Sequence, residues 1–214
     1  MVDEPTRLIL IRHGETLWNR ATRIQGHTDI PLSPLGLSQA ERLAQALADE
    51  PLAAIYASDL SRARQTADAL ARMQGLPVQL DAGLRERAFG RFEGLSWAQI
   101  SEEYPEDAER WRRREPDFEV GGGESLTTFS ARCIAAARRA AAAHPGQAIA
   151  LVAHGGVLDC LYRAATRVTL ESPRSWQLGN AAINRLLATA DGFTLVGWND
   201  DRHLAGLSAD DVAA

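Results

Sequence analysis

The chain has 214 residues, of which 45% are hydrophobic and 24% are charged, as is typical of one soluble globular domain. Its formal net charge of −5 argues against nucleic acid or an anionic membrane as the main partner. All 23 permanently positive side chains are arginine, and the absence of lysine excludes Schiff-base chemistry and the phosphate-binding lysine of P-loop proteins.

The cysteines and the N-terminus bear on the compartment. Cys133 and Cys160 are too few for a disulfide framework or a four-ligand zinc site, and each lies in an apolar helical pattern typical of buried core thiols. Residues 1–5 lack the basic and apolar regions of a signal peptide, and no apolar run reaches membrane-spanning length. We therefore expect a soluble, cytoplasmic protein.

Strands and helices alternate in the first third of the chain. Residues 8–11 form a continuous apolar run, as expected for a central strand, and residues 33–49 begin with Ser-Pro and continue with helical spacing. Residues 53–57 predict a second buried strand, and residues 58–75 predict a second helix that is closed by glycine. This alternation indicates a parallel α/β sheet.

The segment at residues 84–124 is less regular. It holds a predicted helix around Trp97 and an arginine-rich turn at residues 110–114. We expect a lid-like excursion at about residues 86–124 that covers the carboxyl edge of the sheet.

The alternation returns in the last part of the chain. An alanine-rich helix is predicted over residues 126–144, followed by a buried strand at residues 148–153 and a further helix. Two more strands, at residues 182–187 and 193–198, flank a tight turn. Because there is no internal repeat and no linker, residues 1–214 are predicted to form a single domain.

Two of the predicted strands end in a His-Gly pair, at His13 and at His154. Ligands of open α/β sheets bind outside the carboxyl ends of the strands, and glycine lets the backbone approach a ligand closely. One histidine after a strand is weak evidence for function, but two of only five in equivalent positions are a stronger signal. We expect His27, His144 and His203 to be structural or exposed, although His27 lies near the candidate site.

Arg62 and Arg64 lie near the start of the second predicted helix. A cation near a helix N-terminus is unfavourable, but a bound anion would offset that cost. The residues alone leave two alternatives for Arg62, an anion-binding side chain or a solvated one, and they favour the solvated alternative for Arg64.

Five blocks of the chain, in order, resemble the histidine phosphatase superfamily, which includes the phosphoglycerate mutases. The blocks are Leu10–Thr16 with Trp18-Asn19 and Gln25-Gly26, Tyr56–Ala67, Leu84–Gly94, Gly122–Ser125 and Val152–Gly156, and the tail at residues 199–204 is similar as well. The resemblance covers nearly the whole chain. It implies a three-layer α/β/α sandwich with a mostly parallel central sheet, as in phosphoglycerate mutases.

The resemblance also implies catalytic roles. His13 would attack phosphorus as a neutral imidazole and carry the phosphoryl group. Arg12, Arg62 and His154 would bind the non-bridging oxygens. His154 would help most as a cation or a hydrogen-bond donor, with its pKa raised beside the phosphate. Glu86 would protonate the leaving oxygen and later take a proton from water.

Glu86 has a competitor and a simpler explanation. Glu93 is the competing acid, but the family pattern places the acid at the first glutamate, before Phe89. Without the resemblance, a surface pair with Arg85 or Arg87 would be the simpler explanation of Glu86.

Further substrate contacts are expected from positions that match the family or follow the catalytic strands: Asn19, Gln25, Gly26, Gly155 and Asn180. The arginine cluster at residues 110–114 has two alternatives. It forms a solvated helix face, which is favoured, or it reaches from the lid onto an anionic substrate.

The sequence thus predicts hydrolysis of a phosphate monoester, a small phosphorylated metabolite, through a phosphohistidine intermediate. Phosphoglycerate mutase-type transfer is the runner-up, which the short lysine-free segment between Glu93 and Gly123 disfavours. A non-catalytic phosphate-binding module is less expected, because His13 and Glu86 are both present. No cofactor and no metal are expected, since arginine and histidine can hold a phosphoryl group without one. The oligomeric state stays open, with a homodimer as one alternative.

Overall fold

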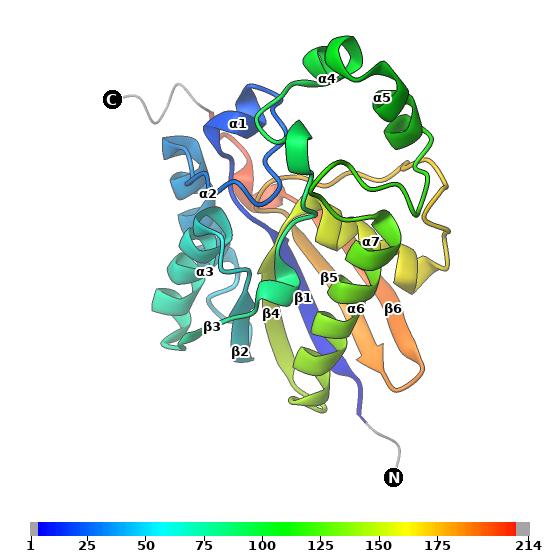
Figure 1. The fold of residues 1–214 in the computed structure, drawn as a ribbon. Coiled ribbons are helices and arrows are strands. Elements are labelled where there is room, and N and C mark those ends of the chain that lie inside the picture. The colour runs from blue at the N-terminus through cyan, green and yellow to red at the C-terminus, as the bar shows by residue number, and fades with distance from the viewer. Residues whose placement is uncertain (1–3, 209–214) are drawn as a thin grey trace.

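A central β-sheet lies between two layers of helices in the computed structural model of the protein, which describes residues 4–208 (Figure 1). The strands are β1 (Thr6–Arg12), β2 (Leu52–Ala57), β3 (Val78–Leu80), β4 (Ala148–Ala153), β5 (Ile183–Thr189) and β6 (Gly192–Asp200). The helices are α1 (Leu17–Arg20), α2 (Pro34–Ala46), α3 (Ser61–Gln74), α4 (Trp97–Glu103), α5 (Pro105–Arg112), α6 (Leu126–Ala142) and α7 (Gly155–Thr166). Short 3₁₀ helices lie at Ala82–Leu84, Gly90–Phe92 and Arg202–Leu204.

The sheet is mostly parallel, as predicted. Its strand order is β3-β2-β4-β1-β5-β6, in which the first four strands run parallel and β5 and β6 form an antiparallel edge. Every residue of β4 is buried, and so are most residues of β1. Helices cover both faces of these central strands, which explains why their sequences are continuous apolar runs.

Each face of the sheet has its own apolar core. Leu8 and Leu10 of β1 pack on the face covered by α6 and α7, whereas Ile9 and Ile11 pack on the face covered by α2 and α3. This division follows from the two-residue period of a strand. The first core also holds Cys133 and Cys160, which are free and buried as predicted.

Capping residues set the ends of the helices. The Ser33 side chain accepts a hydrogen bond from the backbone N–H of Gly36, and Pro34 follows at the first helical position of α2. Ser125 caps α6 in the same way. At its C-terminus α3 ends at Gly75, whose φ of 65° is in the left-handed region that favours glycine.

The segment between β3 and α6 lies above the carboxyl ends of the strands (Figure 1). It encloses a small apolar core of its own, formed by Phe92, Ile100, Ala108, Phe118 and Val120. The predicted arginine-rich turn is partly wrong, because residues up to Arg112 belong to α5. Charged residues dominate α5 and hide its helical period, while Arg114, with a φ of 56°, turns the chain after it.

Leu43 and Leu37 of α2 form a matched pair, because replacing each by alanine compares a buried with an exposed leucine of the same helix. Leu43 is fully buried and Leu37, on the same helix, is 47% exposed. We expect Leu43→Ala to lower the free energy of unfolding by about 2–5 kcal/mol, because it leaves a cavity in a close-packed core. Leu37→Ala should cost less than about 1 kcal/mol. Urea unfolding followed by circular dichroism measures both, and equal costs would contradict the assigned packing of α2.

Candidate active site

The carboxyl ends of β1 and β4 meet side by side. In their parallel register Arg12 pairs with Ala153, so that the next residues, His13 and His154, are neighbours. Their ring centroids lie 5.2 Å apart in an edge-to-face arrangement. Both side chains are buried, with exposed fractions of 3% and 0%. The two strand-end histidines of the sequence therefore belong to one site.

His13 presents an unprotonated nitrogen. Its Nδ1 lies 2.7 Å from the carbonyl oxygen of Gly14, which can only accept, so Nδ1 carries the hydrogen and Nε2 keeps its lone pair. Burial, with Arg62 and Arg12 nearby, holds the pKa of His13 well below its ordinary value of 6.5. The neutral imidazole with a free Nε2 is the form that can attack phosphorus.

His154 has the opposite tautomer. Arg62 Nε donates to His154 Nδ1 at 3.3 Å, so the ring hydrogen is on Nε2. This Nε2 is buried and has no hydrogen-bond partner in residues 4–208. Without a bound anion, burial and the positive charge of Arg62 hold the pKa of His154 well below 6.5, and the raised pKa expected beside a phosphate stays a prediction. His154 thus offers a neutral N–H donor.

Two guanidinium groups, that of the half-buried Arg12 and that of the buried Arg62, complete the positive side of the site. Arg12 donates through Nη1 to the carbonyl oxygen of Leu178, while its Nε is buried without a partner. Burial lowers the pKa of both Arg12 and Arg62, and no carboxylate oxygen of the described residues lies within 4.0 Å of either group. Buried cations without counterions favour a bound anion.

Arg62 is fully buried, so the solvated alternative for this residue is wrong. Its Nη1 and Nη2 donate to the carbonyl oxygens of Thr28 and Gly26 at 3.0 and 2.8 Å. Arg64, by contrast, has a side chain that is 61% exposed and lies 3.9 Å from Asp68, as the solvated alternative requires.

Glu93 anchors the loop at residues 25–28. Its carboxylate accepts hydrogen bonds from the backbone N–H groups of His27, at 2.9 Å, and of Phe89, at 3.0 Å. Gly26 has a φ of 55°, and a Cβ there would lie 2.1 Å from Glu93 Oε1, so only glycine fits. The competing acid is therefore engaged in holding the loop.

The carboxylate of Glu86 is held by two backbone N–H groups. Its Oε1 accepts from the backbone N–H of Arg87 at 2.9 Å and its Oε2 from that of Gly156 at 3.1 Å. The surface-pair alternative is wrong, because Arg85 binds Asp59 and the Arg87 guanidinium donates to backbone carbonyls. A Cβ at position 156 would lie 2.2 Å from Glu86 Oε1, so the acid needs glycine beside it.

A cavity of about 280 Å³, called here the phosphate cavity, joins most of the expected residues. Its lining includes Arg12, His13, Asn19, Gln25, Gly26, Arg62, Glu86 and Gly155. His154 lies against the His13 ring rather than among the lining residues. Asn180 is also outside the lining, and its amide donates to the carbonyl oxygen of His13 at 2.9 Å. Asn180 therefore positions the nucleophile.

Sequence reasoning missed five side chains that line this cavity, namely Arg23, Ile24, Phe89, Arg174 and Leu178. Phe89 lies inside the family-like block Leu84–Gly94, and Arg23 lies between the family-like segments Trp18-Asn19 and Gln25-Gly26. Their positions in the sequence could therefore have indicated that they line the site. Arg174 lies between α7 and β5, in a segment without periodicity, and nothing in the sequence pattern distinguished it from a surface arginine.

The remaining histidines have structural partners, as predicted. His27 Nε2 lies 2.8 Å from the carbonyl oxygen of Glu86, His144 Nε2 lies 3.0 Å from the hydroxyl of Tyr56, and His203 Nε2 lies 3.0 Å from the carbonyl oxygen of Ala181. The contact of His27 ties the backbone of the candidate acid to the loop held by Glu93.

The arginine cluster at residues 110–114 divides into two groups. Arg110 pairs with Glu115, and Arg112 and Arg113 pair with Glu109, all with half or more of the arginine side chain exposed. The favoured solvated alternative is thus correct for these three. Arg114 instead turns inward, where its side chain is 24% exposed and bonded to Asp159.

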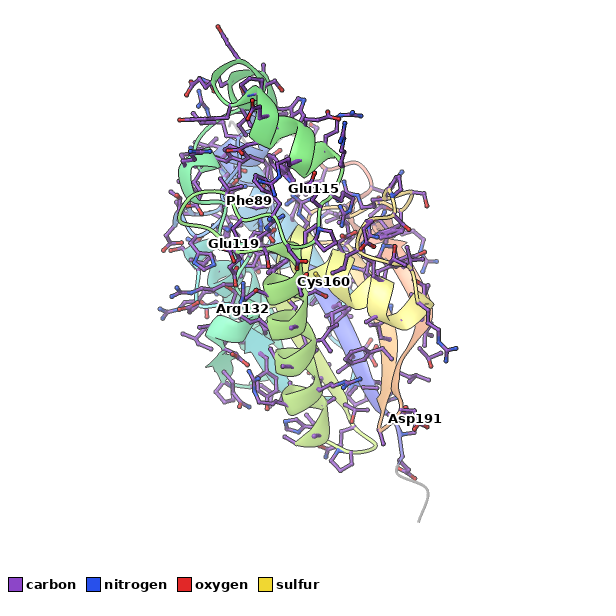
Figure 2. All side chains as sticks on the ribbon, turned by 45° about the vertical axis from the view of Figure 1, so that its right-hand side comes forward. Phe89, Glu115, Glu119, Arg132, Cys160 and Asp191 are labelled. Carbon is purple, nitrogen blue, oxygen red and sulfur yellow. The ribbon has the colours of Figure 1, made fainter. Side chains whose placement is uncertain are left out.

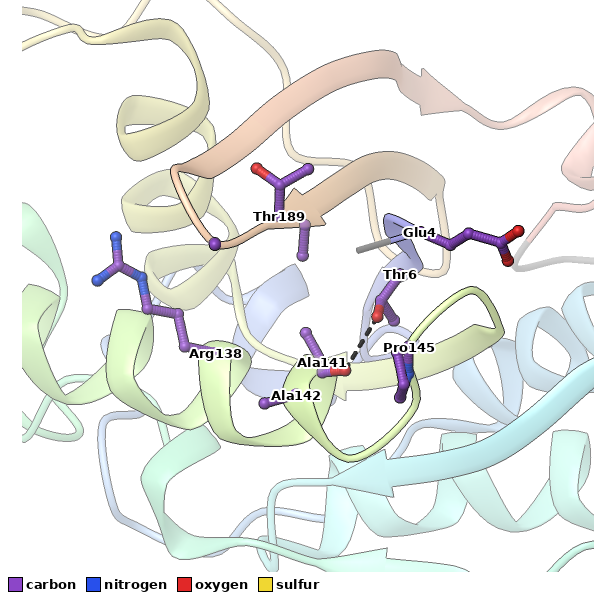
Figure 3. A pocket seen from close by; sticks show the side chains of 9 residues that line it. Glu4, Thr6, Arg138, Ala141, Ala142, Pro145 and Thr189 are labelled. Carbon is purple, nitrogen blue, oxygen red and sulfur yellow. Dashed lines mark hydrogen bonds between the residues drawn. The ribbon is translucent and has the colours of Figure 1, made fainter. Parts of the chain in front are cut away.

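A separate cavity of about 380 Å³ lies at the other end of the sheet, near Thr6 and the C-terminus of α6 (Figure 3). Its described lining holds one acid, Glu4, and one arginine, Arg138, but no histidine. In residues 4–208 no group of three or more His, Cys, Asp or Glu could hold a metal ion. Within the same range, no helix is long and apolar enough to cross a membrane.

Comparison with known proteins assigns the family. The model of the histidine phosphatase superfamily (branch 1) matches residues 8–201. The chain is 37% identical over 201 residues to phosphoglycerate mutase-like protein 4 of Arabidopsis thaliana, covering 92% of this chain and 86% of that protein. It is 35% identical over 207 residues to metal-independent phosphoserine phosphatase of the same plant, covering 95% and 85%. The chain belongs to the histidine phosphatase superfamily.

Solved structures of this superfamily confirm the predicted fold. A mycobacterial glucosyl-3-phosphoglycerate phosphatase, solved as a complex with VO3, has a TM-score of 0.82 and 33% identity over 91% of this chain and 99% of its own. A Bacillus stearothermophilus protein has a TM-score of 0.86 and 30% identity over 93% and 99%. The three-layer, phosphoglycerate mutase-like architecture expected from the sequence is therefore correct.

The lowered pKa values of the two site histidines predict a pH dependence of stability. Between those values and 6.5 the unfolded chain binds more protons than the folded chain, so the free energy of unfolding falls as the pH falls. Each histidine should contribute a loss of roughly 1.4 kcal/mol between pH 7.5 and pH 5.5. We expect His154→Gln to remove one such contribution in urea unfolding at the two pH values. If the free energy of unfolding had the same pH dependence in the wild type and in His154→Gln, this result would contradict the burial of a neutral His154.

Proposed function

We propose that this protein hydrolyses a small phosphate monoester and that His13 carries the phosphoryl group between the two half-reactions. One observation carries the proposal: the free Nε2 of His13 lies among buried donors that lack partners, Arg12 Nε and His154 Nε2. A nucleophile surrounded by unused donors suits a tetrahedral anion. Relatives named as phosphoserine, glucosyl-3-phosphoglycerate and α-ribazole-5′-P phosphatases support hydrolysis.

In the first half-reaction, His13 Nε2 attacks phosphorus, the N–P bond forms and the bond from phosphorus to the leaving oxygen breaks. Arg12, Arg62 and the His154 Nε2–H stabilise the charge on the non-bridging oxygens. Glu86 gives a proton to the leaving oxygen.

In the second half-reaction, water attacks the phosphohistidine. Glu86, now a carboxylate, takes the proton from water as the oxygen–phosphorus bond forms, and the N–P bond breaks to release inorganic phosphate. His13 returns to the neutral ring whose Nδ1–H is held by the carbonyl oxygen of Gly14.

Phosphoryl transfer to a second hydroxyl is the alternative, because other relatives are named as a phosphoglycerate mutase-like protein and as a probable phosphoglycerate mutase. The two reactions share the first half-reaction and differ in what attacks the phosphohistidine. The cytoplasmic location expected from the sequence stays a prediction.

The phosphohistidine can be observed directly. The protein reacts with a ³²P-labelled monoester and is then quenched rapidly without acid. We expect the wild type to hold an acid-labile, base-stable label that His13→Ala lacks. His144→Gln, which changes a histidine outside the phosphate cavity, serves as the matched control and should keep the label. A labelled His13→Ala protein would overturn the assignment of the nucleophile.

The fate of the same label separates hydrolysis from transfer. We expect it to appear as inorganic phosphate, at equal rates with and without added 2,3-bisphosphoglycerate. Isomerisation of 3-phosphoglycerate that greatly exceeds phosphate release would favour the mutase instead.

If Glu86 protonates the leaving oxygen, the loss of rate in Glu86→Gln should depend on whether the leaving group needs a proton. Glu86→Gln keeps the shape of the side chain but cannot give or take the proton. We expect kcat for an alkyl phosphate to fall by about 10²- to 10⁴-fold. Formation of the phosphohistidine from p-nitrophenyl phosphate, whose leaving group needs no proton, should fall much less in rapid-quench measurements. Equal losses for both substrates would contradict the assignment of Glu86 as the acid.

A further inference from the structure

Two side chains outside the phosphate cavity hold the backbone that follows the nucleophile. Thr66 of α3 accepts a hydrogen bond from the backbone N–H of Gly14, and Gln39 of α2 accepts one from that of Glu15. Neither Thr66 nor Gln39 is among the residues that line the phosphate cavity. Their effect on the reaction must therefore pass through the position of His13.

The hydroxyl of Thr66 joins the loop of the nucleophile to α3. Its Oγ1 accepts from the backbone N–H of Gly14 at 3.0 Å and donates to the carbonyl oxygen of Arg62, one turn earlier in α3, at 2.8 Å. Thr66 is fully buried, so water does not compete for these bonds. At the other end of the same peptide group, the carbonyl oxygen of His13 accepts from the amide of Asn180 at 2.9 Å. The peptide after His13 is thus held at both ends, and Thr66 also links it to the helix of Arg62.

Gln39 holds the next peptide group, whose carbonyl oxygen decides the tautomer of His13. The Oε1 of Gln39 accepts from the backbone N–H of Glu15 at 2.8 Å. The opposite end of that peptide is the carbonyl oxygen of Gly14, which lies 2.7 Å from Nδ1 of His13. If this peptide rotated, Nδ1–H would lose its acceptor. The hydrogen could then move to Nε2, the nitrogen that attacks phosphorus in the proposed reaction.

The first turn of α2 packs directly on this backbone. A Cβ at Gly14 would lie 2.5 Å from the carbonyl oxygen of Gly36, and a Cβ at Gly36 would lie 2.0 Å from the carbonyl oxygen of Glu15. Both distances are too short for a side chain, so both positions need glycine. The backbone N–H of Ser33, the N-cap of α2, also donates to the carbonyl oxygen of Glu15 at 2.8 Å. Because α2 meets the loop without an intervening side chain, Gln39 is held at a fixed place beside Glu15.

The proposed acid is held from the other face of the sheet. Figure 2 shows Arg132 on α6, from which its Nη2 donates to the carbonyl oxygen of Glu86 at 3.2 Å and its Nη1 to that of Arg85 at 3.0 Å. α6 packs on one apolar core of the sheet, whereas α2 and α3 pack on the other. Changes at Gln39 and Thr66 therefore leave the hydrogen bonds of Arg132 to the acid in place.

We propose that Gln39 and Thr66 are positioning residues for the nucleophile. They fix the two peptide groups after His13 and so keep the tautomer in which Nε2 has the lone pair. This inference rests on the proposed function, in which that nitrogen attacks phosphorus. A ring with its hydrogen on Nε2 cannot attack, and the wrong tautomer of a catalytic histidine can lower kcat by about 10⁴-fold.

Variants that remove only the hydrogen bonds test the proposal. Gln39→Met keeps the length of the side chain and removes the amide oxygen, while Thr66→Val keeps the branched shape and removes the hydroxyl. We expect each to lower the rate of phosphohistidine formation from p-nitrophenyl phosphate by about tenfold or more in rapid-quench measurements. The inhibition constant of inorganic phosphate should change by less than about threefold, because Arg12, Arg62 and His154 still bind it.

¹⁵N spectra of protein labelled at histidine report the tautomer directly and need no substrate. The resonances of His13 are those that are missing from the spectrum of His13→Ala. We expect His13 of the wild type to show a protonated Nδ1 and an unprotonated Nε2, and His13 of Gln39→Met to show a mixture of the two tautomers. A merely structural role of Gln39 would lower the temperature of unfolding and leave the tautomer as in the wild type.

Conservative variants and matched controls separate the hydrogen bonds from other effects. Gln39→Glu and Thr66→Ser keep an accepting oxygen and should restore most of the rate. Gln45→Met and Thr166→Val are the matched controls and should react as fast as the wild type. Gln45 is an exposed residue of α2, and the hydroxyl of Thr166 donates to the carbonyl oxygen of Tyr162, one turn earlier in α7, at 2.8 Å. Neither control residue lines the phosphate cavity.

The results distinguish this inference from the proposed function. A labelled wild type, together with wild-type rates in Gln39→Met and Thr66→Val or an unchanged His13 tautomer in Gln39→Met, would overturn only the positioning role. Equal losses of rate in Gln39→Met and Gln39→Glu would overturn it as well, because the accepting oxygen would not be the cause. If Thr66→Val does not fold, the variants of the half-buried Gln39 decide the matter by themselves. A wild type that forms no label on His13 would overturn the proposed function itself.

Discussion

The parallel pairing of β1 with β4 is the constraint on which the site depends. It places Arg12 opposite Ala153, and the two strands then end together at His13 and His154. The backbone N–H of His13 donates to the carbonyl oxygen of Ala153 at 3.0 Å, so the pairing continues into the nucleophile itself. A slip of one residue would turn one of the two histidine side chains to the opposite face of the sheet. The apolar layers on both faces therefore fix the relative position of the two imidazole rings.

Burial gives these groups their chemical character. Desolvation holds both imidazoles neutral, and their hydrogen bonds then decide which nitrogen has the lone pair and which has the hydrogen. The same desolvation acts on Arg12 and Arg62, and among residues 4–208 no carboxylate oxygen lies within 4.0 Å of either guanidinium. Arg62 also holds the carbonyl oxygens of Gly26 and Thr28, so one buried side chain orients the partner histidine and shapes the loop over the phosphate cavity.

The sequence predicts those features that depend on local pattern or on ordered motifs. Continuous apolar runs identified the central strands, and Ser-Pro and glycine signals identified the ends of α2 and α3. The short elements α1 and β3, of four and three residues, have no period to detect. The place of Arg174 in the cavity lining and the inward turn of Arg114 depend on how distant segments pack together, and so does the pKa of His154 in the absence of an anion.

Gly156 makes the residue at position 156 depend on the residue at position 86, although the two positions are far apart in the sequence. Any side chain there would occupy the place of the Glu86 carboxylate and would also approach the ring of Phe129. Positions 86 and 156 are thus expected to diverge together in descendants of this chain: a lineage that keeps the acid must keep the glycine, whereas a lineage that has lost the acid is free to accept alanine or serine at 156. A larger residue at that position is therefore a sequence marker of relatives in which the carboxylate of residue 86 no longer lies beside residue 156.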